Sequence, residues 1–158
     1  MSDRAPFDEA TAPALLLACG NTMRGDDRVG WLVGCAVDNH PQHPNLNVIL
    51  TQQLLPEHAE AVSTASRVVF VDCSAVTAPG EVSTFSILPA DMMPLNYSHS
   101  LDPASLLRLA QELYGRVPET SLAVTVGGQF FDLSESLSPE VEAALPHAVK
   151  AVHTALLN

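Results

Sequence analysis

Two apolar runs without alternation, within residues 14–19 and 67–73, do most to limit the folds open to this chain. Because polar residues do not occupy every second position, each run predicts a strand buried on both faces, as in a parallel sheet covered by helices. Between them lie a helical pattern at 29–37, a strand pattern at 45–51 and, at about 55–66, a helix with proline at its first position. This order is typical of βαβ units.

The alternation of strands and helices breaks after the third strand. A short turn at 77–80 leads directly into 81–87, where polar and apolar residues alternate. Since this turn leaves no room for a crossover helix, we expect the fourth strand to be antiparallel to the third and to lie at an edge. A helix at 102–115, a fifth strand at 122–126 and a last helix capped by Ser138 follow. The pattern predicts an α/β fold with a five-stranded, mostly parallel sheet, one antiparallel edge strand and helices on both faces.

Length and composition indicate one domain. The 158 residues are enough for a sizeable core, and we expect a single domain at 14–158 behind a loose, polar tail at 1–13. The tail has neither the basic start nor the apolar centre of a signal peptide, and no run approaches the roughly 20 apolar residues that a membrane span needs.

Charge and cysteine content narrow the choice of partners and compartment. With a net charge of −11 and only 7 Lys and Arg, the surface would repel nucleic acid, but not a metal ion or a basic peptide. Three widely spaced cysteines, Cys19, Cys35 and Cys73, provide neither a disulfide framework nor a CxxC zinc site. We therefore expect a protein of the reducing cytoplasm.

An acidic turn follows the first strand. It runs through Gly20, Asn21 and Gly25 to the adjacent carboxylates of Asp26 and Asp27, just before the first helix. One of the two aspartates could simply cap that helix. The second would then add repulsion unless a cation or a hydrogen-bond donor balances it, so the turn is a candidate site.

Two further polar side chains are expected at the same edge of the sheet. Asp72 ends the third strand, and His99 precedes the helix that begins at Asp102. Ligands of open α/β sheets bind outside the carboxyl ends of the strands, and the topology brings Asp27, Asp72 and His99 there. Two carboxylates and an imidazole suit a divalent transition metal with open positions. Each residue taken by itself also has a purely structural explanation: Asp72 could form an Asx turn, and His99 could form a hydrogen bond with a loop carbonyl.

The pattern favours metal-assisted hydrolysis over other chemistries. Cys73, Ser74, Ser98 and Ser100 flank the predicted crevice, but the chain has neither a GxSxG nucleophile elbow nor an HExxH zinc helix. The acidic turn lacks a P-loop lysine and would repel phosphate. A bound cation could polarise a carbonyl or activate water.

Several motifs resemble those of the hydrogenase maturation proteases, endopeptidases that trim the C-terminus of the nickel-iron hydrogenase large subunit. The matching stretches are GNTMRGDDRVG at 20–30, QLLPE at 53–57, VDC at 71–73, SHSL at 98–101 and LSPEV at 137–141. The resemblance implies a three-layer α/β sandwich with a twisted mixed sheet.

The resemblance also implies a function and a site. It implies an aspartic-type, metal-dependent endopeptidase in which Asp27, Asp72 and His99 engage nickel supplied by the precursor, although another divalent ion could occupy the site in the isolated protein. Candidates for the general base are Asp26 and an uncoordinated carboxylate oxygen. The chain departs from the family at Arg28, where glycine is common, so a positive φ there would strain the turn or reshape it.

Two rival functions stay open from the sequence. A non-catalytic metal-binding checkpoint module would grip the same precursor without cutting it. A flavodoxin-like nucleotide or flavin binder would share the architecture only.

Overall fold

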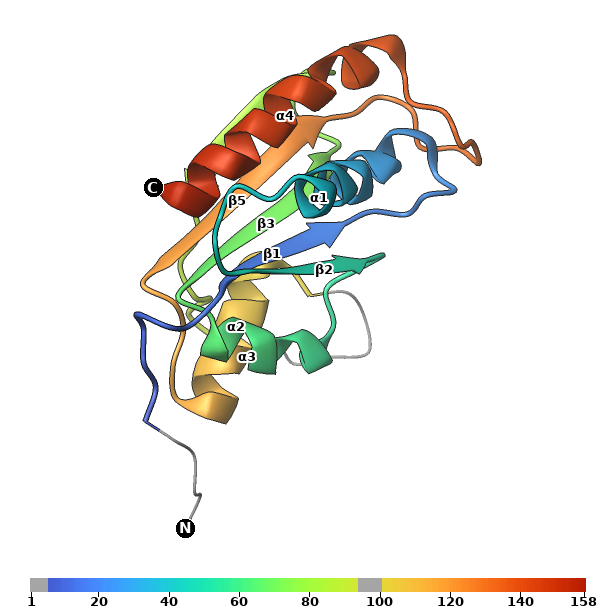
Figure 1. Cartoon of the computed structure of the whole chain (residues 1–158). Coiled ribbons are helices and arrows are strands. Elements are labelled where there is room, and N and C mark those ends of the chain that lie inside the picture. The colour runs from blue at the N-terminus through green and yellow to red at the C-terminus, as the bar shows by residue number, and fades with distance from the viewer. Residues whose placement is uncertain (1–5, 94–100) are drawn as a thin grey trace.

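The computed structural model describes residues 6–93 and 101–158 and contains one five-stranded sheet in the order β2-β1-β3-β5-β4 (Figure 1). The strands are β1 (Ala14–Cys19), β2 (Leu46–Thr51), β3 (Arg67–Ser74), β4 (Val82–Ser86) and β5 (Thr120–Gly127). Four α-helices and two short 3-10 helices surround them within the described residues: α1 (Val29–Asn39), α2 (Ala59–Thr64), α3 (Pro103–Tyr114), α4 (Pro139–Leu157), η1 (Gly25–Arg28) and η2 (Pro56–His58).

The sheet is parallel except at one edge, which confirms the predicted fold class. Strands β2, β1, β3 and β5 are paired in parallel, and β4 pairs antiparallel with β5 at the edge. Strand β4 therefore runs opposite to β3, as expected. However, β5 lies between the two, so the turn that joins β3 to β4 does not form a hairpin.

Helices cover both faces of the sheet and produce three layers (Figure 1). One core cluster joins α1 and α4 to strand residues such as Leu16 and Ala18, and the other joins α2 and α3 to Leu15 and Leu17. Successive residues of β1 thus enter opposite cores, which explains why the first apolar run does not alternate with polar residues.

Helix α1 lies very close to the sheet. A Cβ atom on Gly30 would collide with the carbonyl oxygens of Cys19 and Val71, so the first turn of α1 sits directly on the ends of β1 and β3. Helix α1 leads to β2 on one side of β1, and β3 lies on the other. The order of the sheet reverses between β1 and β3, and such a point is where α/β sheets bind ligands.

The segment before β1 contacts the rest of the chain. The guanidinium of Arg116 lies 3.1 Å from the centre of the Phe7 ring, and the amide of Asn45 donates to the carbonyl of Thr11 at 2.9 Å. Within the described residues, no helix has the length and apolar character to cross a membrane.

Candidate functional site

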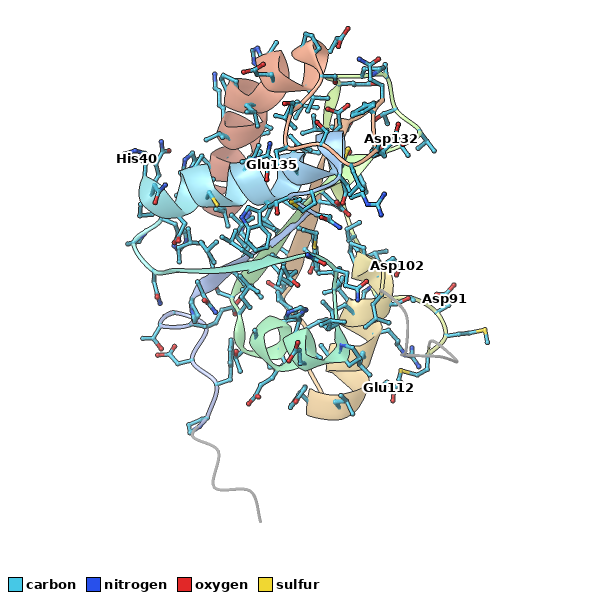
Figure 2. The ribbon with its side chains drawn as sticks, turned by 90° about the vertical axis from the view of Figure 1, so that its right-hand side faces the viewer. His40, Asp91, Asp102, Glu112, Asp132 and Glu135 are labelled. Atoms are coloured by element: carbon cyan, nitrogen blue, oxygen red, sulfur yellow. The ribbon has the colours of Figure 1, made fainter. Side chains whose placement is uncertain are left out.

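A cavity of about 540 Å³ opens at the edge where the parallel strands end. Two of the predicted site residues, Asp27 and Asp72, line it together. Figure 2 looks onto this edge, with Asp102 labelled at about mid-height on its right-hand side. The other described lining residues come from the ends of β1 and β2 and from the start of α3: Cys19, Gln52, Gln53, Leu54, Leu101, Asp102, Pro103 and Ser105.

Asp27 lies in η1, between β1 and α1, and its side chain is half-buried. Its Oδ2 accepts a hydrogen bond from the backbone N–H of Asn21 at 2.9 Å, which fixes the carboxylate across the turn. The turn requires Gly25, whose φ of 58° lies in the left-handed region that favours glycine. Arg28, by contrast, has φ −67° and ψ −20°, so the residue at this position is unstrained.

Asp72 lies near the end of β3, where solvent reaches its side chain through the cavity. Its Oδ1 accepts a hydrogen bond from the N–H of Cys73 at 2.7 Å. Partial desolvation by the surrounding protein, aided by the negative charge of Asp27, raises the pKa of Asp72 to about 6, although the bond from Cys73 opposes this. Near neutral pH the Asp72 carboxyl can therefore both hold and release a proton.

The two cysteines near these carboxylates are poor nucleophiles. Burial, together with the charges of Asp72 and Asp27, raises the pKa of Cys19 to about 12. Burial and the same two carboxylates, with a contribution from Asp26, raise the pKa of Cys73 to about 12. Both thiols stay protonated at neutral pH, and the thiolate is the reactive form.

Asp26 has a different environment from Asp27, although the two are adjacent. It is fully buried, and its carboxylate accepts hydrogen bonds from the N–H groups of Gln129 (2.9 Å) and Phe130 (3.0 Å) and from the N–H and hydroxyl of Ser138 (2.7 and 2.8 Å). Burial alone would raise its pKa, but these hydrogen bonds outweigh it and lower the pKa. Asp26 therefore ties the turn after β1 to the loop after β5.

The structure differs from the expected helix caps at two places. Neither Asp26 nor Asp27 caps α1, whose N-cap residue is Arg28 without a side-chain hydrogen bond. Ser138 precedes α4 as predicted, but its hydroxyl binds Asp26 and does not cap the helix. The cap at Asp102 is confirmed, because its Oδ1 accepts from the N–H of Ser105 at 2.7 Å.

His99, the third predicted ligand, lies outside the described residues. The nearest described residue after it, Leu101, lines the cavity and donates its N–H to the carbonyl of Leu54 at 3.2 Å. Within residues 6–93 and 101–158, no three His, Cys, Asp or Glu side chains are arranged to hold a metal ion. The described part of the chain thus supplies two of the three proposed ligands.

The sequence interpretation gave no site role to Gln52 or to Gln53, the first residue of the QLLPE motif, although both line the cavity just after β2. Their position at the carboxyl end of a parallel strand was the available signal.

Comparison with known proteins identifies the fold. No protein-family model matches the sequence, and no curated protein matches it either. Among solved structures, the hydrogenase maturating endopeptidase HybD from E. coli is 20% identical, with 91% of each chain covered and a TM-score of 0.73. The chain has the fold of the hydrogenase maturation endopeptidases. The resemblance seen in the motifs is thus confirmed at the level of the fold.

Two archaeal structures share this maturation-endopeptidase fold. The [NiFe] hydrogenase maturation protease HybD from Thermococcus kodakarensis is 22% identical over 91% of this chain and 99% of that one, with a TM-score of 0.65. The maturation protease HycI from the same organism is 21% identical over 93% and 94% of the two chains, with a TM-score of 0.67. The similarity therefore extends over nearly the whole length of these proteins.

Proposed function

We propose that the protein is an endopeptidase that removes the C-terminal extension of a nickel-iron hydrogenase large-subunit precursor after nickel insertion. The observation that carries this proposal is the pair Asp27 and Asp72 on one cavity, at the sheet edge of a maturation-endopeptidase fold. The acidic character of the chain supports a cationic substrate centre over nucleic acid. The free cysteines are compatible with a reducing cytoplasm.

The precursor's nickel is part of the substrate in this proposal. Carboxylate oxygens of Asp27 and Asp72, with the imidazole of His99, would engage the ion. Leu101, two residues after His99 in the sequence, lines the cavity. When bound, nickel supplies Lewis-acid polarisation next to the scissile peptide bond.

The chain's own residues would orient the substrate and move protons. The bond from Asn21 holds Asp27 in place, and the bond from Cys73 holds Asp72. A carboxylate oxygen that the ion leaves uncoordinated would be the group to transfer a proton from an attacking water to the leaving amine. The buried Asp26 is left with a positioning role, since its hydrogen bonds engage both of its oxygens.

The test uses precursor with and without nickel. Intact-mass analysis should show loss of the C-terminal extension only from nickel-loaded precursor, and an Asp27→Ala, Asp72→Ala double variant should release no peptide. Equal cleavage of both precursor forms would refute nickel recognition, and cleavage by the double variant would refute the site.

A second function is favoured by one observation. Cys19 and Cys73 are held as thiols and Asp26 is fully engaged by hydrogen bonds, so none of these three residues is an activated nucleophile. A non-catalytic checkpoint module would bind nickel-loaded precursor stoichiometrically and release no peptide from it. The same mass analysis, combined with a binding measurement, separates the two functions.

A further inference from the structure

A second cavity, of about 630 Å³, lies between the C-terminal halves of α1 and α4. Figure 1 shows these two helices on the same face of the sheet. Arg67 begins β3, and its Nη1 donates to the carbonyl oxygen of Ala155 near the end of α4 at 2.7 Å. The end of α4 therefore lies where the parallel strands begin, and this cavity is at the opposite edge of the sheet from the candidate functional site.

One stripe of α4 forms a wall of this second cavity. Ala36 of α1 and His40, which directly follows that helix and is labelled in Figure 2, lie across from it. The stripe recurs at the helical spacing of three and four residues, and its members are Pro146, Val149, Lys150, His153, Thr154 and Leu157.

His153 is a buried polar residue without a partner in the described part of the chain. It is 8% exposed, and neither of its ring nitrogens forms a hydrogen bond with a described residue. Neither nitrogen is sealed from solvent, so the polar edge of the ring faces the cavity. His58, another buried histidine, differs, because its Nδ1 accepts the N–H of Leu55 at 2.9 Å.

Burial also sets the charge of the His153 ring. Desolvation lowers the pKa of His153 below the ordinary value of 6.5, so the ring is neutral at pH 7. A neutral imidazole has one N–H donor and one acceptor nitrogen. A buried polar group that lacks a hydrogen bond destabilises a fold, and a ligand that bonds the ring would remove this cost.

The second cavity is positively charged, in contrast to the chain as a whole. Lys150, the only lysine in the sequence, precedes His153 by three residues, so the two side chains are neighbours on one face of α4. The chain has 18 Asp and Glu, but none is among the described residues that line this cavity. An anion there would meet an ammonium group and an imidazole, without a side-chain carboxylate to repel it.

The remaining walls suit an apolar body. Ala36 contributes only a methyl group, and the aliphatic side chains of Val149 and Leu157 lie across from it. Leu157 is 51% exposed, so a ligand that covers it would remove apolar surface from water. Pockets for small molecules are typically about 300–1,000 Å³ in volume and combine apolar walls with a few polar groups.

We propose that this second cavity binds a small organic anion that has an aliphatic body and one carboxylate head, such as a medium-chain fatty acid. The carboxylate accepts hydrogen bonds from the ammonium of Lys150 and from the imidazole N–H of His153. The aliphatic chain packs against Val149 and Leu157. The site is independent of the proposed peptidase function.

The experiment uses octanoate as the probe and the full chain at pH 7. Isothermal titration calorimetry should give one site with a Kd below about 1 mM, a modest affinity for a ligand of this size. The alcohol 1-octanol has the same aliphatic chain without the charge, and it should bind at least about tenfold more weakly. In NMR spectra, the imidazole signals that are missing from a His153→Leu variant should shift when octanoate is added to wild-type protein.

Two variants remove the polar contacts separately. Lys150→Gln changes an exposed side chain and should weaken octanoate binding at least about tenfold, while 1-octanol binding stays within about twofold. His153→Leu should also lower the affinity for octanoate relative to that for 1-octanol. His147→Leu is the matched control, because it makes the same change on the same helix at a residue that lines a different cavity. It should keep the wild-type affinity.

Three results would overturn the proposal. The first is the absence of saturable octanoate binding in the expected range. The second is equal affinity for octanoate and 1-octanol, which would mean that the cavity does not recognise the charge. The third is an unchanged octanoate affinity in both Lys150→Gln and His153→Leu, which would place the bound anion elsewhere on the protein.

Discussion

Ser138 donates both its backbone N–H and its hydroxyl to the carboxylate of Asp26, at 2.7 and 2.8 Å, although the two residues are 112 positions apart. With the N–H groups of Gln129 and Phe130, this gives a buried carboxylate four donors. The two adjacent aspartates therefore have different structural roles. Asp26 stabilises the turn from within, and Asp27 is held at the cavity.

The first prediction concerns this buried carboxylate. Asp26→Asn should lower the free energy of unfolding by at least about 2 kcal/mol, because it removes the charge and places an NH₂ group among four donors. Ser138→Ala loses only the hydroxyl and should cost about 1 kcal/mol. Urea unfolding followed by circular dichroism measures both. If Asp26→Asn unfolded at the same urea concentration as the wild-type protein, the structural role of Asp26 would be contradicted.

The second prediction concerns Asp72 and pH. Its folded-state pKa of about 6 lies above the ordinary value of 3.8, so the stability linked to its protonated form is full below pH 3.8 and is lost as the pH rises through 6. Asp72→Asn should therefore raise the melting temperature of the metal-free protein at pH 7.5 and leave it unchanged at pH 3.5. A rise of the same size at both pH values would mean that ionisation of Asp72 does not strain the fold.

The third prediction concerns Gly30. Because its missing Cβ would collide with backbone oxygens of β1 and β3, Gly30→Ala should force α1 away from the sheet and cost at least about 3 kcal/mol. Gly115→Ala is the comparison: its Cβ would meet no atom within 4 Å, but its φ of 76° strains an alanine by about 1–2 kcal/mol. Chemical unfolding of both variants shows which one loses more unfolding free energy. An equal loss in the two would argue against the close approach of α1 to the sheet.

The fourth prediction concerns Cys73. A thiol whose pKa is near 12 is not a nucleophile at neutral pH, so Cys73→Ala should release peptide from nickel-loaded precursor within about threefold of the wild-type rate. Single-turnover mass analysis measures this rate. A loss of a hundredfold or more, with an unchanged melting temperature, would instead point to covalent catalysis by Cys73.

The sequence predicted those features that follow from strand direction. Asp27 and Asp72 each come after a buried parallel strand, so their arrival at one edge required only the βαβ order. The neighbour of β4 could not be predicted in this way, because β5 enters the sheet between β3 and β4 after a separate helix. The role of Asp26 was hidden for a similar reason, since its donors lie more than 100 positions later in the chain. The part played by His99 stays a prediction.

The glycine at the start of α1 has a consequence for the distance between the two cavity carboxylates. Asp27 lies three positions before Gly30, and Asp72 directly follows Val71, whose carbonyl oxygen Gly30 approaches. The backbone of α1 therefore packs directly against the backbones of β1 and β3, with no side chain at position 30 between them. A methyl group at this position would push the first turn of α1, and Asp27 with it, away from the strand that carries Asp72, and so increase the distance between the two carboxylates.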